Sequence, residues 1–159
     1  MVKNKVPVIN LSIGGGPNAL IAKAIEHASA KGVVMIASAG NGGPFSKREN
    51  YPAAYPSVIA ITAVDRNKRN ARFASSGDYI EFATPGVGIG AAVPGGGKAM
   101  SGTSFSTPIF TGYAAAMKHF KLKTTDDLRT DFQKFAVDTA KPGRDRFTGW
   151  GVVQVPPIC

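Results

Sequence analysis

Hydrophobic residues in the first part of the chain gather in short continuous runs rather than in alternating patterns. Three such runs are rich in valine, isoleucine and alanine and end at glycine or polar residues; they span residues 6–13, 33–39 and 58–64. Strands buried on both faces of a parallel sheet have this composition. We therefore expect three parallel strands, with binding groups at their carboxyl ends, where ligands bind in open α/β sheets.

The segment between the first two runs has the periodicity of a helix. Residues 18–31 place Ile21, Ala24, Ile25 and Ala28 on one face, and Gly32 supplies the glycine that commonly follows a helix end. A helix that connects two parallel strands predicts an α/β layer architecture.

After Asp65 the hydrophobic pattern becomes more broken. Short strand-like pieces follow at residues 71–76, 79–84 and 89–93, and the glycine-rich residues 94–97 predict a mobile loop over the binding cleft.

Two more helices are predicted in the second half of the chain. One starts near Ser104 and carries apolar residues at three- and four-residue spacing, namely Ile109, Phe110, Tyr113, Ala114, Met117 and Phe120. The other begins with a capping sequence at residues 124–127 and buries Leu128, Phe132, Phe135 and Ala136.

The first of these helices begins in the motif Gly102-Thr103-Ser104-Phe105-Ser106-Thr107-Pro108. We expect Pro108 in the first helical turn, where a missing N–H costs little. Ser104 would then lie at a helix N-terminus, whose free N–H groups and partial positive charge favour a developing anion. A serine that only caps the helix fits the same position, so this motif alone leaves both interpretations open.

Three further segments precede the serine motif in a fixed order. They are residues 8–17 (VINLSIGGGP), 32–43 (GVVMIASAGNGG) and 51–65 (YPAAYPSVIAITAVD). Together with the serine motif they resemble the C-terminal half of the subtilisin-like serine protease (subtilase) family, over about residues 6–153. The resemblance implies an α/β fold with a parallel sheet in the three-layer subtilisin-like arrangement, in which residues 149–153 resemble the closing strand. Residues 1–159 would form a single domain, the C-terminal portion of a subtilisin-like peptidase domain.

The resemblance also implies roles in catalysis. Ser104 matches the nucleophile, and Asn41 matches the asparagine whose side-chain amide donates to the oxyanion, with Thr103 in support. The implied activity is that of a serine endopeptidase, a hydrolase that cleaves peptide bonds through an acyl-enzyme intermediate.

Further residues are matched to substrate binding. Backbone groups of Ser12, Ile13 and Gly14 would pair with an extended polypeptide substrate. The pocket for the side chain before the scissile bond would be lined by Gly15, Ala37, Ser38, Gly40 and Asn50.

A base that could activate Ser104 is not evident. His27 falls on the flank of the first predicted helix, and His119 follows Ser104 by about 20 Å along one helix, beyond hydrogen-bond reach. In subtilases the catalytic Asp and His precede the serine, which places both upstream of this chain. We therefore expect the chain to be inactive alone and to need Asp and His from an upstream segment or a second polypeptide.

Three explanations of this gap stay open. The chain could be a fragment of a longer protease, a separately encoded half completed by another polypeptide, or a subtilase-derived module that binds peptides or assembles without cleaving. Binding of extended peptides without turnover would distinguish the last of these.

Composition limits the other possibilities. A chain of 159 residues with 43% hydrophobic content can bury a substantial core. We expect no membrane span and see no signal-peptide core in this sequence, so the compartment is not predicted. Cys159 is the single cysteine, which excludes an internal disulfide.

The formal net charge of +9 raises nucleic acid as an alternative partner. The basic residues form short clusters at 47–48, 66–72 and 118–123 without interleaved aromatic residues for base stacking. We favour solvated turns and helix ends over a nucleic-acid surface.

Two local features complete the expectations. The carbonyls of Ala53, Tyr55 and Val58 with Glu81 could form a weak calcium site, although plain loop structure is favoured because one carboxylate is few for calcium. No other metal or cofactor is expected. The Tyr51-Pro52 bond is a candidate cis peptide beside the pocket.

Overall fold

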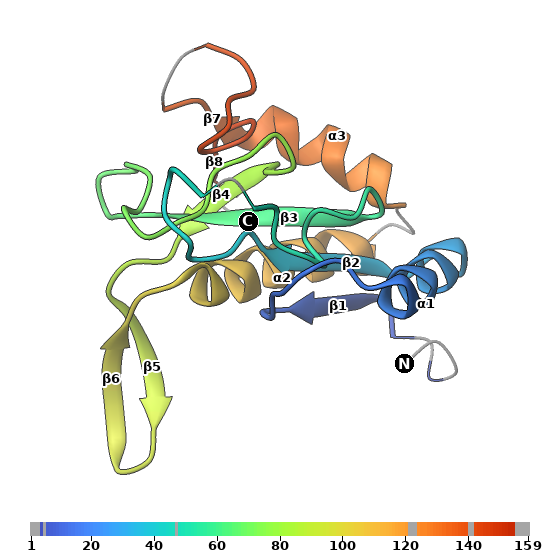
Figure 1. Cartoon of the computed structure of the whole chain (residues 1–159), viewed down its shortest axis with the longest axis horizontal. Helices are drawn as coiled ribbons and strands as arrows, with labels where there is room; N and C mark the ends of the chain where they lie inside the picture. Colours follow the sequence, from blue (N-terminus) through green and yellow to red (C-terminus); the bar gives the residue numbers. More distant parts are fainter. Residues whose placement is uncertain (1–3, 5, 47, 121–123, 140–141, 155–159) are drawn as a thin grey trace.

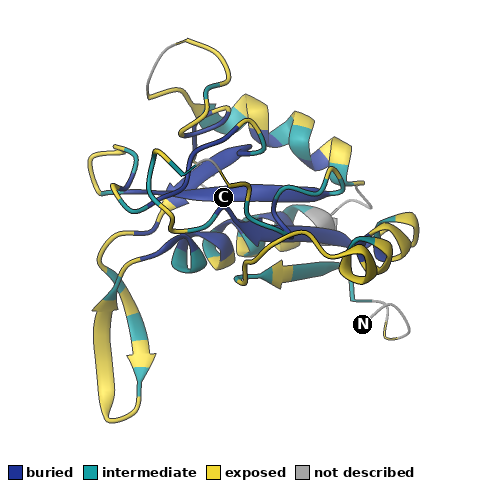
Figure 2. Cartoon of the chain, in the orientation of Figure 1, coloured by how far each residue is buried: buried dark blue, intermediate teal, exposed yellow. Residues whose placement is uncertain are grey.

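Six strands form one sheet in the computed structural model, which describes residues 4, 6–46, 48–120, 124–139 and 142–154, without the side chains of residues 118–120. Their order is β1-β2-β3-β4-β8-β7, and all neighbouring pairs are parallel except β7 and β8. The strands are β1 (Val8–Leu11), β2 (Val34–Ser38), β3 (Val58–Val64), β4 (Phe82–Pro85), β7 (Ala136–Val137) and β8 (Val152–Val153). All side chains of β2 and β3 are buried, as expected for central parallel strands (Figure 2).

Helices cover both faces of this sheet (Figure 1). On one face α1 (Ala19–Ala30) contributes Ile25 and Ala28 to a core with alternate residues of β2 and β3. On the other face α2 (Thr103–Phe120) and α3 (Thr125–Phe135) pack on the remaining residues of the same strands. Phe82, Phe110 and Phe132 form the centre of this second core. The predicted three-layer α/β fold is confirmed.

The ends of α1 follow the sequence prediction, but its buried face is narrower than expected. Asn18 caps the helix by accepting hydrogen bonds from the N–H groups of Leu20 and Ile21, and Gly32 follows the helix with a φ of 76°. Ile21 is 45% exposed and Ala24 is exposed as well, contrary to the prediction. This side of α1 therefore exposes apolar surface.

Strand β1 is shorter than predicted. It ends at Leu11, and residues 12–14 lead to Gly15, which pairs with Tyr51 through two backbone hydrogen bonds of 2.9 and 3.0 Å. Since β1 is the first strand in the sheet order, its outer edge has no neighbouring strand among the described residues.

Helix α2 starts at Thr103, one residue earlier than predicted, and this places Pro108 in its second turn rather than its first. Proline has no N–H to donate to the Ser104 carbonyl. The hydroxyl of Ser12 donates to that carbonyl instead, at 3.0 Å. The start of α2 is thereby tied to the carboxyl end of β1.

Helix α3 begins as the sequence predicts. Thr124 and Asp127 form a reciprocal capping box, and Leu128 and Phe132 are fully buried. The closing strand is also found, as β8.

Two predictions for the middle of the chain are wrong. Residues 71–76 do not form a strand: the N–H of Ala71 bonds the Ala63 carbonyl of β3, that of Ala74 bonds within the loop, and that of Ser75 bonds the segment after β2. The glycine run at 94–97 lies at the tip of a β-hairpin, β5 (Ile89–Val93) with β6 (Gly96–Met100), whose turn is residues 94–95. This hairpin projects away from the sheet instead of covering a cleft (Figure 1). Among the described residues, no helix is long and apolar enough to cross a membrane.

Candidate active site

Ser104 is the second residue of α2 and is half-buried. Its hydroxyl donates a long hydrogen bond of 3.5 Å to the Ser12 carbonyl, while the Ser12 hydroxyl bonds the Ser104 carbonyl. The N–H of Ser104 is one of those at a helix start that have no partner within the helix. A hydroxyl and a free N–H are therefore presented together at the carboxyl edge of the sheet.

Asn41 is the third residue after the end of β2, and this position places it beside the helix start. Its Oδ1 accepts hydrogen bonds from the N–H and the hydroxyl of Thr103, at 3.1 and 3.0 Å. The Thr103 hydroxyl in turn accepts from the N–H of Gly40 at 3.2 Å. Since two donors hold Oδ1, the orientation of the amide is fixed.

The other end of that amide is available for a ligand. Within the described part of the chain, Nδ2 of Asn41 donates no hydrogen bond, and it lies 3.6 Å from the position that a Cβ on Gly102 would occupy. Nδ2 therefore faces the turn that leads into Ser104. The structure thus brings Ser104, Asn41 and Thr103 together.

The predicted substrate strand runs along the same edge. The Ile13 carbonyl accepts from the Ser38 hydroxyl at 3.3 Å, and the side chain of Ile13 is 59% exposed. Among the described residues, the backbone N–H and carbonyl of Gly14 have no hydrogen-bond partner. An extended chain could pair with these free groups as an added strand.

A cavity of about 720 Å³ lies between this segment and Asn41. Of the predicted pocket residues, Gly15, Gly40 and Asn50 line it, as does Gly14 of the predicted substrate strand. The Asn50 amide donates to the Ser38 carbonyl at 2.9 Å and packs against the Cα of Gly14, so a side chain at position 14 would collide with it.

Two predicted pocket residues lie elsewhere. Ala37 and Ser38 are buried and do not line this cavity, since strand β2 turns both side chains toward the protein interior. Ala37 is part of the core beneath α1.

Several cavity residues were missed by sequence reasoning. They are Gly16, Pro17, Gly42, Ser46 and Ser75, whereas Arg48, Glu49 and Tyr51, which also line the cavity, were expected near it. Ser75 reaches the cavity because its hydroxyl accepts from the N–H of Gly42 at 2.9 Å, a contact between loops far apart in sequence. Tyr51 donates to Glu49 at 2.8 Å, and this hydrogen bond raises the pKa of Tyr51.

No histidine or carboxylate contacts the Ser104 hydroxyl among the described residues. His27 lies in the last turn of α1, and this helix returns the chain to the start of β2. His27 therefore lies at the amino ends of the strands, whereas Ser104 lies at their carboxyl ends. The side chain of His119 lies outside the described residues, and its helical position is about 20 Å along α2 from Ser104.

Two of the four groups considered for a weak calcium site, the Glu81 carboxylate and the Val58 carbonyl, are already engaged by an arginine. The guanidinium of Arg129 donates to both carboxylate oxygens of Glu81, at 2.7 and 2.9 Å, and to the carbonyls of Pro56 and Val58, at 2.7 and 3.2 Å. These residues therefore do not fit a calcium ion. In the part of the chain that the structure describes, no three His, Cys, Asp or Glu residues gather as metal ligands do.

Electrostatics favours this arginine contact. Burial lowers the pKa of Arg129, but the hydrogen bonds and charges of Glu81 and Asp126 outweigh burial and raise the pKa overall.

The Tyr51-Pro52 bond is cis, as the sequence suggested, and Cys159 lies outside the described residues.

Comparison with known proteins agrees with this geometry. A sequence profile described as "Subtilase family" matches residues 1–151. The chain belongs to the subtilase family. It is 34% identical over 156 residues to the minor extracellular protease Epr of Bacillus subtilis (strain 168), and 40% identical over 117 residues to subtilisin DY of Bacillus licheniformis.

Solved subtilase structures superpose closely on this chain. Sphericase and the S41 psychrophilic protease each give a TM-score of 0.83, at 32% and 31% identity, and each covers 94% of this chain. The chain spans 57% of each of those two structures, 43% of subtilisin DY and 24% of Epr. It therefore corresponds to part of the length of its relatives.

Proposed function

We propose that this chain supplies the nucleophile and the oxyanion-binding half of a subtilisin-like serine endopeptidase. The observation that carries the proposal is the Asn41–Thr103 contact, which directs a free amide toward the helix start that bears Ser104. Membership of the subtilase family supports the same reaction class.

The reaction is acyl transfer to Ser104. A histidine base removes the hydroxyl proton as Oγ attacks the peptide carbonyl, and the carbonyl π electrons move to oxygen. The amide of Asn41 and the N–H of Ser104 then donate to this oxyanion. The C–N bond breaks as the histidine returns the proton to the leaving amine, and water hydrolyses the resulting ester.

The histidine and its aspartate come from outside the described residues, from an upstream segment or a second polypeptide. The open edge of β1 supports this source, because an unpaired strand edge is a template for a further strand. Exposed apolar side chains beside it support the same docking: Ile13 is 59%, Leu20 78% and Ile21 45% exposed. We refer to these three residues as the edge patch.

A fluorophosphonate probe tests this function, because it labels only an activated serine. We expect negligible labelling of the isolated chain and rapid labelling of Ser104 once a subtilase amino-terminal segment carrying Asp and His is added. Ser104→Ala is the control and must abolish labelling. Rapid labelling of the isolated chain would show that no outside base is needed, and no labelling in either mixture would contradict a catalytic role.

A peptide-binding module without catalysis is the second candidate. The free backbone groups of Gly14 and the adjoining cavity favour it, since they need no base. It predicts that extended peptides bind without turnover, with affinity unchanged in Ser104→Ala, as measured by titration calorimetry.

A further inference from the structure

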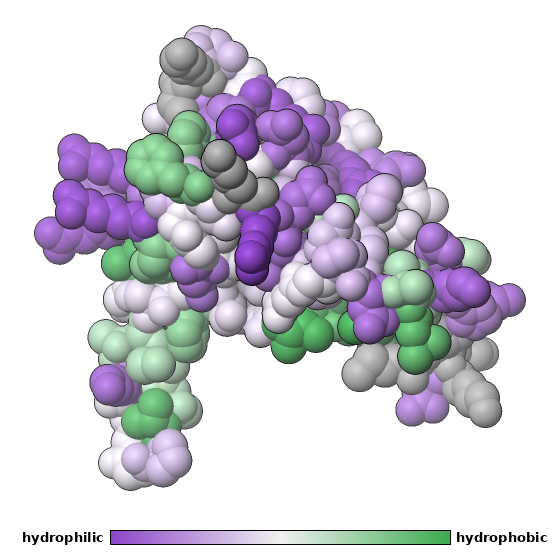
Figure 3. Space-filling model, in the orientation of Figure 1, coloured by the Kyte–Doolittle hydropathy of each residue, from purple (hydrophilic) through white to green (hydrophobic). Residues whose placement is uncertain are grey.

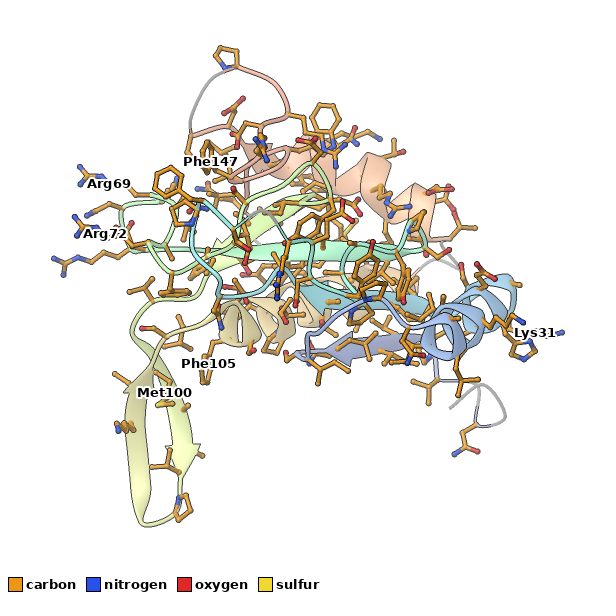
Figure 4. The ribbon with its side chains drawn as sticks, viewed as in Figure 1. Lys31, Arg69, Arg72, Met100, Phe105 and Phe147 are labelled. Carbon is orange, nitrogen blue, oxygen red and sulfur yellow. The ribbon has the colours of Figure 1, made fainter. Side chains whose placement is uncertain are left out.

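The loop between β3 and β4 carries an exposed group of cations. Arg66, Lys68, Arg69 and Arg72 are all exposed, and we refer to these four residues as the basic loop. Figure 4 shows Arg69 and Arg72 extending into solvent at one end of the molecule, and Figure 3 shows the strongly hydrophilic projection there.

The backbone of the basic loop is fixed from within. The Asp65 carboxylate accepts from the N–H groups of Asn67 and Arg69, at 2.8 and 2.9 Å, and two backbone hydrogen bonds join Asp65 to Lys68 and Arg69. Lys68 adopts a φ of 62° in this turn. Arg66, Lys68 and Arg69 are therefore held on a short ordered turn, and Arg72 lies in the next turn of the loop, so little backbone entropy is lost when a ligand binds.

The charge of the basic loop is not neutralised by the protein. Among the described residues, none of its four cations takes part in an ion pair. The nearest carboxylate in sequence, that of Asp65, is occupied by backbone N–H groups. Four like charges on one loop repel one another, and an anionic ligand relieves this repulsion.

The loop is tied directly to the wall of the active-site cavity. The N–H of Gly43 donates to the Phe73 carbonyl at 2.9 Å, and the N–H of Ser75 donates to the Gly40 carbonyl at 2.9 Å. Ser75 lines the cavity and also accepts from Gly42. The basic loop is thus continuous with the segment that carries Asn41.

We infer that the basic loop recruits polypeptide substrates that carry an acidic stretch next to the segment bound in the cleft. This inference rests on the proposed function, because it takes the cavity to be a polypeptide site. An acidic polypeptide fits better than a nucleic acid, since the loop is joined through Ser75 and Gly40 to the segment that lines the cavity. Phe147 is the exposed aromatic residue joined to the loop, through the Asn70 amide at 2.7 Å, whereas single-stranded nucleic acids use successive stacking side chains.

Binding to the Ser104→Ala chain tests the inference without requiring cleavage. Fluorescence anisotropy compares a labelled extended peptide containing Asp and Glu with its Asn and Gln counterpart and with an oligonucleotide of equal charge. We expect the acidic peptide to bind best and Arg69→Gln/Arg72→Gln to weaken it about three- to tenfold. The neutral peptide should be unaffected by this variant.

The matched control is Lys23→Gln/Lys31→Gln, which removes the same charge from exposed positions of α1 and its C-cap. Figure 4 shows Lys31 at the end of the molecule opposite to Arg69 and Arg72. We expect this control to leave the affinity for the acidic peptide unchanged. Equal weakening by both variants would mean that overall charge acts, and this would overturn the inference.

Two further outcomes would also overturn it, namely equal affinity for the acidic and neutral peptides or stronger binding of the oligonucleotide. Failure of the proposed catalytic function is recognised separately, by absent fluorophosphonate labelling in the presence of the amino-terminal segment. If the acidic peptide binds selectively but labelling is absent, the inference about the basic loop stands and the proposed catalytic function is rejected.

Discussion

The hydroxyl of Thr103 joins the start of α2 to the segment that carries Gly40 and Asn41. Its Oγ1 donates to Asn41 and accepts from the N–H of Gly40, and its own N–H also donates to Asn41. The orientation of the amide that would stabilise an oxyanion therefore depends on a residue that need not contact substrate. Thr103 is fully buried, so water does not compete for these hydrogen bonds.

Thr103→Val tests this positioning role, because valine keeps the shape of threonine but removes the hydroxyl. We expect the variant to lose about 1–3 kcal/mol of stability in urea unfolding and to shift the NMR signals of the Asn41 side-chain amide. Thr107→Val is the matched control, since its hydroxyl donates only to the Thr103 carbonyl within α2. Unmoved Asn41 signals in Thr103→Val would contradict the positioning role.

Tyr79 predicts a pH dependence of stability. Burial raises its pKa above the ordinary value of 10.0, and its hydroxyl donates to the Ala39 carbonyl at 2.6 Å. Because the folded protein holds this proton more tightly than the unfolded chain, the contribution is complete below pH 10 and is lost as pH rises through the folded-state pKa.

Tyr79→Phe removes this contribution. We expect it to lower stability at neutral pH by about 1 kcal/mol and to flatten the decline above pH 10, followed by urea unfolding at several pH values. Parallel declines in both proteins would show that Tyr79 is not the titrating group.

At the scale of elements, α3 is fastened to the sheet by Arg129 as well as by its buried side chains. The guanidinium joins α3 to the carbonyl groups around the start of β3 and to Glu81 just before β4. Glu81 is 11% exposed in its side chain, so a carboxylate left there without this partner would destabilise the fold. A protein cation thus takes the place that the sequence suggested for a weakly bound metal ion.

Arg129→Met leaves the Glu81 carboxylate without its partner. We expect a loss of about 2–4 kcal/mol in urea unfolding and no change in the thermal midpoint of the unaltered protein when a calcium chelator is added. Lys134→Met is the control in the same helix; its ion pair with Asp131 is a local surface contact, worth about 0.5 kcal/mol. A midpoint lowered by the chelator would restore a calcium site.

The elements that the sequence predicted well are those whose signal is local. Buried runs located β2 and β3, and capping residues located the starts of α1 and α3. Local signals were insufficient where the deciding contact comes from a residue far away in the sequence. Pro108 has no N–H for the Ser104 carbonyl, and the Ser12 hydroxyl donates to that carbonyl instead. Arg129 and Ser75 were missed for the same reason, because their partners lie far away in the sequence.

At the scale of the whole molecule, the two sides of the sheet differ in how they end. One side ends in the two-residue strand β7, whereas the other ends in the four-residue strand β1, next to the edge patch; neither outer edge has a neighbouring strand among the described residues. Ile13 and Ile21 share a hollow of about 110 Å³ with Tyr51 and Tyr55. Apolar surface of this kind promotes association.

We expect the isolated chain to self-associate through this region as its concentration rises. Leu20→Lys/Ile21→Lys should reduce the association by adding charge to the edge patch, as measured by sedimentation. Phe45→Lys is the control, because Phe45 is 91% exposed in a loop away from α1. Equal effects of the two variants would show that the edge patch is not the contact.

The outer edge of β1 has no neighbouring strand among the described residues, so a separate polypeptide that docks there would be lost on dilution, and proteolytic activity with it. A base carried by a separate polypeptide would dissociate as the mixture is diluted, so activity would fall more steeply than the concentration of either chain. A base joined through a short linker would keep an effective concentration of about millimolar, and its activity would fall only in proportion. The concentration dependence of turnover therefore distinguishes assembly from two molecules from assembly within one.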